Sequence, residues 1–141
     1  MIPNILLVED DHLDIIHANR VLSQVKLIHN LHVAKNGEEA LKMLGIGAGS
    51  EEAIYPLPEI ILLDLNMPRM NGLEFLSIMR ADERLKNIKV FVISTSGDEI
   101  DKELARELGV SGYIEKPFRL NSTTSKDSFN LHIDLINLKS A

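Results

Sequence analysis

The chain carries short, continuous runs of apolar residues rather than an alternating apolar and polar pattern. Four runs are clear and a fifth is weaker: "ILLV" (5–8), "IILL" (60–63), "VFVI" (90–93), "GYI" (112–114) and, as the weaker run, "LHVA" (31–34). Continuous β-branched runs are typical of strands that are covered on both faces, as in a parallel sheet. The pattern therefore predicts five buried strands.

Helical spacing of apolar residues fills the segments between these runs. Five helices are predicted, over His12 to about Lys26, 37–44, from Asn71 or Gly72 onward, 98–108 and about 125–139. Asp11 is a suitable N-cap for the first, and Gly109 is placed to end the fourth. This repeated strand–helix order predicts the α/β class, with right-handed crossovers and helices on both faces of one sheet.

The last predicted helix has two apolar stripes. Phe129, Ile133 and Ile136 form one, and Leu131, Leu135 and Leu138 form the other. One core-facing side of a helix needs only one such stripe. The leucine stripe is therefore expected either to form a homodimer seam or a kinase-docking patch, or to be buried together with the first stripe inside the monomer.

Length and composition limit the class of protein. The 141 residues suit one domain spanning 1–141, with an irregular loop at 45–58 and no apolar run near the length of a bilayer span. The start of the chain lacks a basic secretory leader, and the absence of cysteine excludes disulfides and thiolate metal sites. The net charge of −6, without a basic patch, disfavours nucleic acid as a partner. A cytoplasmic protein with no membrane attachment is expected.

Polar residues follow four of the predicted strands at the point where each one ends. They are Glu9, Asp10 and Asp11 after 5–8, Asp64 after 60–63, Ser94 and Thr95 after 90–93, and Lys116 and Pro117 after 112–114. Taken singly, each is explained as a helix cap, a turn residue or a surface lysine. Because the carboxyl ends of parallel strands share one edge of the sheet, we expect them to meet.

Converging carboxylates repel one another unless a cation or a proton separates them. Oxygen-only ligands suit a hard ion such as Mg²⁺ or Mn²⁺, which leaves coordination positions open for phosphate. A carboxylate such as Asp64 can itself be a nucleophile and form an acyl phosphate. The residue types therefore favour phosphoryl chemistry with a divalent cation.

Five segments together resemble the receiver domain of two-component response regulators. They are "ILLVEDD" (5–11), "NGEEAL" (36–41), "ILLDLNMPRMNGLEFL" (61–76), "VFVISTS" (90–96) and "GYIEKPF" (112–118). The resemblance runs from Asn4 to Phe118 and implies a doubly wound, flavodoxin-like sheet of five parallel strands in the order 2-1-3-4-5. The long 45–58 loop is similar to that of single-domain regulators associated with bacterial phytochromes.

The resemblance implies a role for each residue that matches the motif. Asp64 is the expected phosphorylated residue. Glu9, Asp10, Asp64 and the backbone carbonyl of Asn66 are expected to form the site for Mg²⁺ or Mn²⁺, with Asp10 as a direct ligand and Glu9 acting through water. Glu9 stands where aspartate is commoner in the family, which still permits chelation of the ion.

The remaining matches concern the response to phosphorylation. Ser94 corresponds to the switch hydroxyl, where threonine is commoner, and Lys116 to the lysine that pairs with phosphate. Tyr113 corresponds to the aromatic switch residue, and a cis bond is expected before Pro117. The implied function is a stand-alone switch rather than an enzyme, which receives its phosphoryl group from a sensor histidine kinase or phosphotransfer protein. It would signal by altered contact with a downstream protein.

Three other readings compete with this one. A haloacid dehalogenase-type phosphatase needs a second aspartate where Asn66 stands. A flavodoxin-type flavin binder needs a hydroxyl-rich phosphate loop where Glu9, Asp10 and Asp11 would repel the phosphate. A receiver-like module that binds partners without being phosphorylated is the strongest rival, although the chain keeps Asp64, the acidic pair and Lys116.

Overall fold

The computed structural model describes residues 2–25, 29–47, 53–95, 98–120 and 125–138. Its centre is one sheet of five parallel strands, in the spatial order β2-β1-β3-β4-β5. The strands are β1 (Asn4–Val8), β2 (Asn30–Ala34), β3 (Ile60–Leu63), β4 (Lys89–Ser94) and β5 (Gly112–Glu115). Each contains the apolar run that predicted it, and the expected strand order is confirmed.

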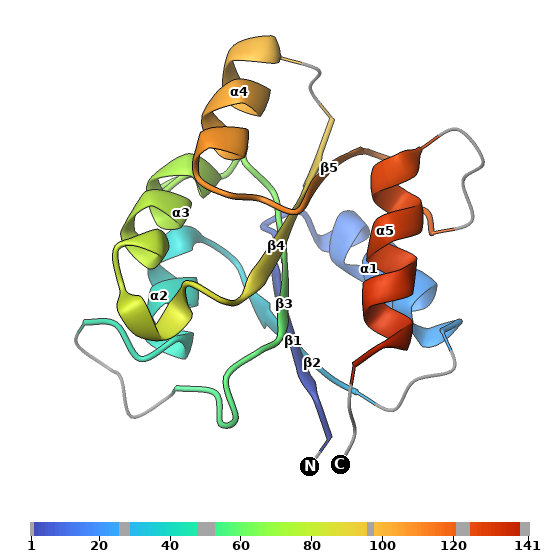
Figure 1. Cartoon of the computed structure of the whole chain (residues 1–141), viewed down its shortest axis with the longest axis horizontal. Helices are drawn as coiled ribbons and strands as arrows, with labels where there is room; N and C mark the ends of the chain where they lie inside the picture. Colours follow the sequence, from blue (N-terminus) through green and yellow to red (C-terminus); the bar gives the residue numbers. More distant parts are fainter. Residues whose placement is uncertain (1, 26–28, 48–52, 96–97, 121–124, 139–141) are drawn as a thin grey trace.

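Helices cover both faces of the sheet (Figure 1). They are α1 (His12–Ser23), α2 (Gly37–Met43), α3 (Gly72–Arg80), the short 3-10 helix η2 (Glu83–Leu85), α4 (Glu99–Glu107) and α5 (Lys126–Ile136). The second, third and fourth α-helices lie on one face, and α1 and α5 lie on the other. No helix within the described ranges combines the length and the apolar character needed to cross a membrane.

The sheet separates two hydrophobic cores. Successive residues of a strand point to opposite faces, so Leu6 and Val8 contribute to one core while Ile5 and Leu7 contribute to the other. All four residues of β3 are buried. This burial on both faces explains why the sequences of the strands are continuous apolar runs without alternating polar residues.

The structure corrects the expectation for the leucine stripe of α5. Leu131 and Leu135 are completely buried against the sheet, and Leu138 packs on the same core. The other stripe faces outward, with Phe129 58% exposed and Ile136 56% exposed. The seam hypothesis for the leucines is therefore wrong, because α5 must bury one face to cover the sheet. A Leu135→Glu substitution would report on folding rather than on association.

Gly72 fixes the start of α3 against the loop that follows β3. A Cβ atom at this position would lie 2.5 Å from the carbonyl oxygen of Asp64 and 2.7 Å from the Cα of Leu65. The Gly72 amide also donates a hydrogen bond of 3.0 Å to the Leu65 carbonyl. Only glycine permits this approach, so the helix and the loop that carries Asp64 are in direct backbone contact.

Arg80, the last residue of α3, connects three segments of the chain. Its guanidinium donates hydrogen bonds of 3.0 to 3.4 Å to the backbone carbonyls of Leu85, Lys86, Ile88, Leu108 and Gly109. The first three carbonyls lie in and after η2, and the other two lie at the end of α4. One side chain thus donates to carbonyls at the ends of two helices and in the segments that follow them, where carbonyls lack partners within a helix; the Leu85 carbonyl also accepts from the Ile88 amide.

Arg69 adopts a left-handed backbone conformation, with φ of 69°. This conformation costs a non-glycine residue about 1–2 kcal/mol. We expect Arg69→Gly to be more stable than Arg69→Ala by about 0.5–1 kcal/mol, after allowing for the greater chain entropy of unfolded glycine. Both variants lose the same exposed ion pair with Glu38, so comparing their urea denaturation isolates the backbone effect. Equal stability would contradict it.

Candidate functional site

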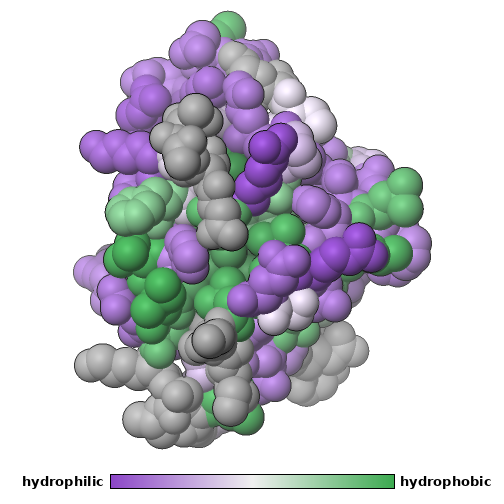
Figure 2. All heavy atoms as spheres, turned by 90° about the vertical axis from the view of Figure 1, so that its right-hand side faces the viewer, coloured by the Kyte–Doolittle hydropathy of each residue, from purple (hydrophilic) through white to green (hydrophobic). Residues whose placement is uncertain are grey.

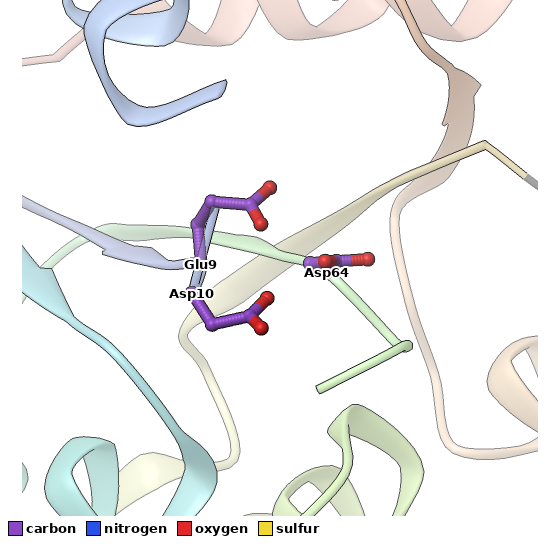
Figure 3. Close-up of side chains that lie close together, drawn as sticks. All are labelled: Glu9, Asp10 and Asp64. Atoms are coloured by element: carbon purple, nitrogen blue, oxygen red, sulfur yellow. The ribbon is translucent and has the colours of Figure 1, made fainter. Parts of the chain in front are cut away.

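Three carboxylates meet where β1 and β3 end. Glu9 and Asp10 follow β1, Asp64 follows β3, and their side chains point toward the same side (Figure 3). One oxygen from each lies within 4.8 Å of the others. They line an open cleft of about 540 Å³ that also includes Asn66 and Lys116. The predicted convergence at this edge of the sheet is therefore present.

The three carboxylates differ in burial, and burial makes the negative charge of Glu9 costly. Glu9 and Asp64 are 3% and 5% exposed, whereas Asp10 faces solvent. Burial raises the pKa of Glu9 to about 7, the charge of Asp64 raises it as well, and the hydrogen bond from Lys116 opposes both. A divalent cation would remove this cost, and the donor set of three carboxylate oxygens fits Mg²⁺ or Mn²⁺.

Lys116 is the cationic counterpart of this cluster. Its Nζ lies 2.8 Å from Glu9 Oε1, 2.7 Å from Asp14 Oδ2 and 3.6 Å from Asp64 Oδ2. Burial acts to lower the pKa of Lys116, but the hydrogen bonds to Asp14 and Glu9 and the charge of Asp64 outweigh it and raise the pKa. Lys116 is therefore protonated and holds a positive charge beside Asp64.

The two oxygens of Asp64 have different neighbours. Oδ1 accepts a hydrogen bond of 3.2 Å from the backbone amide of Asn66, while Oδ2 faces Lys116. The Asn66 side-chain amide donates to the hydroxyl of Ser94 at 3.5 Å, and Ser94 is completely buried at the end of β4. Asn66 and Lys116 thus contact Asp64 directly, and Ser94 contacts Asn66.

Tyr113 lies apart from the acidic cluster, in the middle of β5. Its ring is partly exposed, and the ammonium of Lys102 in α4 lies 5.4 Å from the ring centroid. The Tyr113 amide donates a hydrogen bond of 2.8 Å to Asp127 of α5. The expected cis bond between Lys116 and Pro117 is present.

The sequence reasoning missed Asp14, which makes the shortest contact to Lys116. Asp14 lies in the first turn of α1, where acidic residues are common and ordinarily interpreted as favourable to the helix dipole. Asp14 could have been identified from its expected position in the fold. The first turn of a helix that follows β1 lies at the same sheet edge as the end of β5.

Comparison with known proteins agrees with this geometry. Residues 5–126 match the family described as the response regulator receiver domain. Response regulator Rcp1 from Synechocystis sp. (strain ATCC 27184 / PCC 6803 / Kazusa) is 35% identical over 127 residues, which cover 90% of this chain and 82% of that protein. The similarity thus extends well beyond the motifs around Asp64.

Solved structures show the same similarity in three dimensions. The phosphorylated cyanobacterial phytochrome response regulator RcpA has a TM-score of 0.74 and 32% identity, covering 96% of this chain and 89% of that chain. The Mn²⁺-bound form of response regulator Rcp1 has a TM-score of 0.78 and 32% identity, covering 97% of each chain. With its fold, its acidic cleft and these relatives in agreement, the chain belongs to the response regulator receiver domain family.

Proposed function

We propose that Asp64 accepts a phosphoryl group from a sensor histidine kinase or a phosphotransfer protein, and that the domain acts as a switch for a downstream protein. The observation that carries this proposal is the environment of the Asp64 carboxylate. One oxygen is held by the Asn66 amide, the other faces the ammonium of Lys116, and the residue lines the acidic cleft. The structures of phosphorylated RcpA and Mn²⁺-bound Rcp1 support the same chemistry.

In the transfer step, a carboxylate oxygen of Asp64 forms a bond to phosphorus while the bond between phosphorus and the donor's histidine nitrogen breaks. Glu9, Asp10, Asp64 and the Asn66 carbonyl would hold Mg²⁺ or Mn²⁺, which supplies positive charge against the phosphoryl oxygens when bound. Lys116 contributes charge from the other side of Asp64. The Asn66 amide keeps the attacking carboxylate oriented.

The switch follows from the new charge. Phosphorylation replaces the single negative charge of the Asp64 carboxylate with a phosphoryl group that carries about two, and this group attracts the hydroxyl of Ser94 and the ammonium of Lys116. Lys116 would then exchange contacts with Glu9 and Asp14 for contacts with phosphate. Movement of Ser94 at the end of β4 makes room for Tyr113 of the neighbouring β5 to turn inward, which changes the surface that a protein partner, including a second copy of this chain, would contact.

Phosphorylation by a small donor tests this proposal without the unidentified kinase. Acetyl phosphate with Mg²⁺ is expected to give one phosphoryl adduct in the intact mass, and EDTA is expected to suppress it because the acidic cleft then repels the donor. The adduct should be labile in base, as an acyl phosphate is. A protein that stays unmodified with Mg²⁺ would favour the rival, a module that binds partners without phosphorylation.

The proposed metal site gives a second prediction. Asp10→Asn is expected to weaken Mn²⁺ binding on the order of tenfold or more, because a charged ligand is lost. Asp11→Asn is the matched control, since it removes the same charge one residue away and asparagine still caps α1. Mn²⁺ titration followed by electron paramagnetic resonance measures both variants. Equal affinities in Asp10→Asn and the wild type would contradict the assignment.

A further inference from the structure

A second pocket, of about 520 Å³, lies on the face of the molecule built by α1 and α5. Its apolar wall is formed by Val21, Val25, Pro117, Phe118 and Leu120. Figure 2 looks onto this face and shows apolar surface in its middle next to strongly hydrophilic surface. The volume lies within the range of pockets that hold small organic ligands, which are mostly apolar with a few polar groups that orient the ligand.

The polar residues that line this pocket are basic or neutral. They include Arg20 from α1 and Arg119 from the segment after β5, together with His17 and His132. Within the described residues, neither guanidinium has a hydrogen-bond or ion-pair partner. Two unpaired arginines beside one apolar pocket are unexpected in a chain whose net charge is −6.

The acidic residues of the same two helices are already engaged elsewhere. Asp14 binds Lys116, Asp134 binds Lys89, and Asp127 accepts the hydrogen bond from the Tyr113 amide. Asp11 caps the first turn of α1. Among the residues that the structure describes, the two guanidiniums at this pocket therefore have no acidic partner and are available to an anion.

We propose that this pocket binds a small amphiphilic anion, with its apolar body on Val21, Val25 and Leu120 and its carboxylate or similar head group near Arg20 and Arg119. An apolar ligand without charge would leave both guanidiniums unused. A compact polar anion would leave the apolar wall exposed to water. Only a molecule with both properties satisfies the whole lining.

The pocket is separate from the acidic cleft, and a small cavity between them shares lining residues with both. His17 and Phe118 line the pocket and also border a small cavity beside Glu9, Asp64 and Lys116. The His17 ring nitrogen Nε2 lies 2.8 Å from the Phe118 carbonyl oxygen, which holds this wall together. An occupant would thus contact the chain at Pro117 and Phe118, directly after Lys116.

Titration calorimetry with decanoate, below its micelle concentration, tests the proposal on the whole chain. We expect saturable binding of one decanoate, and about fivefold or greater weakening in both Arg20→Gln and Arg119→Gln, because a charged contact to the head group is lost. The matched control is Arg106→Gln on α4, whose guanidinium pairs with Glu103 and lies away from the pocket. Its affinity should stay within about twofold of wild type.

Two further measurements distinguish binding in this pocket from nonspecific adsorption of an alkyl chain to the protein surface. Decanol, with the same chain length and no charge, should bind about tenfold more weakly or worse. Methyl resonances of Val21, Val25 and Leu120 should shift on addition of decanoate. The Asp64→Asn variant should bind decanoate as the wild type does, so the result is independent of the proposed phosphorylation.

Any of four results would overturn the proposal. They are no saturable binding, wild-type affinity in both pocket variants, equal affinity for decanol, and resonance shifts confined to the exposed Phe129 and Ile133 stripe. The first result would also be obtained if this pocket received only a side chain from a protein partner. Circular dichroism of each variant confirms that the comparison is between folded proteins.

Discussion

Asp64→Asn is expected to abolish phosphorylation by acetyl phosphate. Asparagine has nearly the same shape as aspartate, so it can keep the hydrogen bond from the Asn66 amide. Its neutral amide is not a nucleophile toward phosphorus, and no second carboxylate of the described residues occupies the same position between Asn66 and Lys116. The intact mass of the variant, incubated with acetyl phosphate and Mg²⁺, should show no adduct where the wild type shows one.

The control for this experiment is Asp11→Asn. Asp11 belongs to the same acidic segment and lines the same cleft, but its side chain caps α1. Removing its charge is expected to leave the adduct in place. An adduct that persists in Asp64→Asn, or an acid-stable adduct on a serine, would show that Asp64 is not the acceptor.

Arg80→Met is expected to destabilise the fold by about 2–4 kcal/mol, because it removes a charged donor from several partly buried carbonyls at once. Burial lowers the pKa of the Arg80 guanidinium, which nevertheless stays protonated. Methionine preserves most of the apolar stem, so the loss reports on the hydrogen bonds. Urea denaturation followed by circular dichroism measures the change.

The matched control is Arg106→Met in the last turn of α4. This arginine makes one exposed ion pair with Glu103, and its loss should cost no more than about 0.5 kcal/mol. If both arginine variants have the same stability, the carbonyls around Arg80 are adequately satisfied by water, and the connecting role assigned to Arg80 is wrong.

Most of the fold could be predicted from the sequence because the burial of each strand determines which of its own residues are apolar. Residues 60–63 had to be apolar on both faces because helices cover both sides of β3, and that requirement is visible as "IILL". The caps were equally local, since Asp11 and Asn71 each accept a hydrogen bond from an amide three residues later. The site followed in turn, because parallel strands place Glu9, Asp64 and Lys116 at one edge.

The remaining features depend on contacts between distant segments or on facts that periodicity does not contain. The Asp14–Lys116 pair spans 102 positions, and an acidic residue in a first helical turn has no distinguishing pattern. Arg80 donates to backbone carbonyls, which every residue has. The two stripes of α5 have similar spacing, so the sequence could not show that Leu131 faces the sheet and Phe129 faces outward.

The contact between Tyr113 and Asp127 has a consequence for aggregation. β5 is an edge strand of only four residues, and an open strand edge invites pairing with another chain. The outward amide of Tyr113 already donates to Asp127, and the first turn of α5 lies so close that a Cβ on Gly112 would be 3.0 Å from the Asp127 Cβ. The first turn of α5 thus obstructs the edge at Gly112 and Tyr113 for an added strand. We therefore expect a protein partner to bind β5 through contacts with its side chains, Tyr113 among them, and not by backbone hydrogen bonds along the strand.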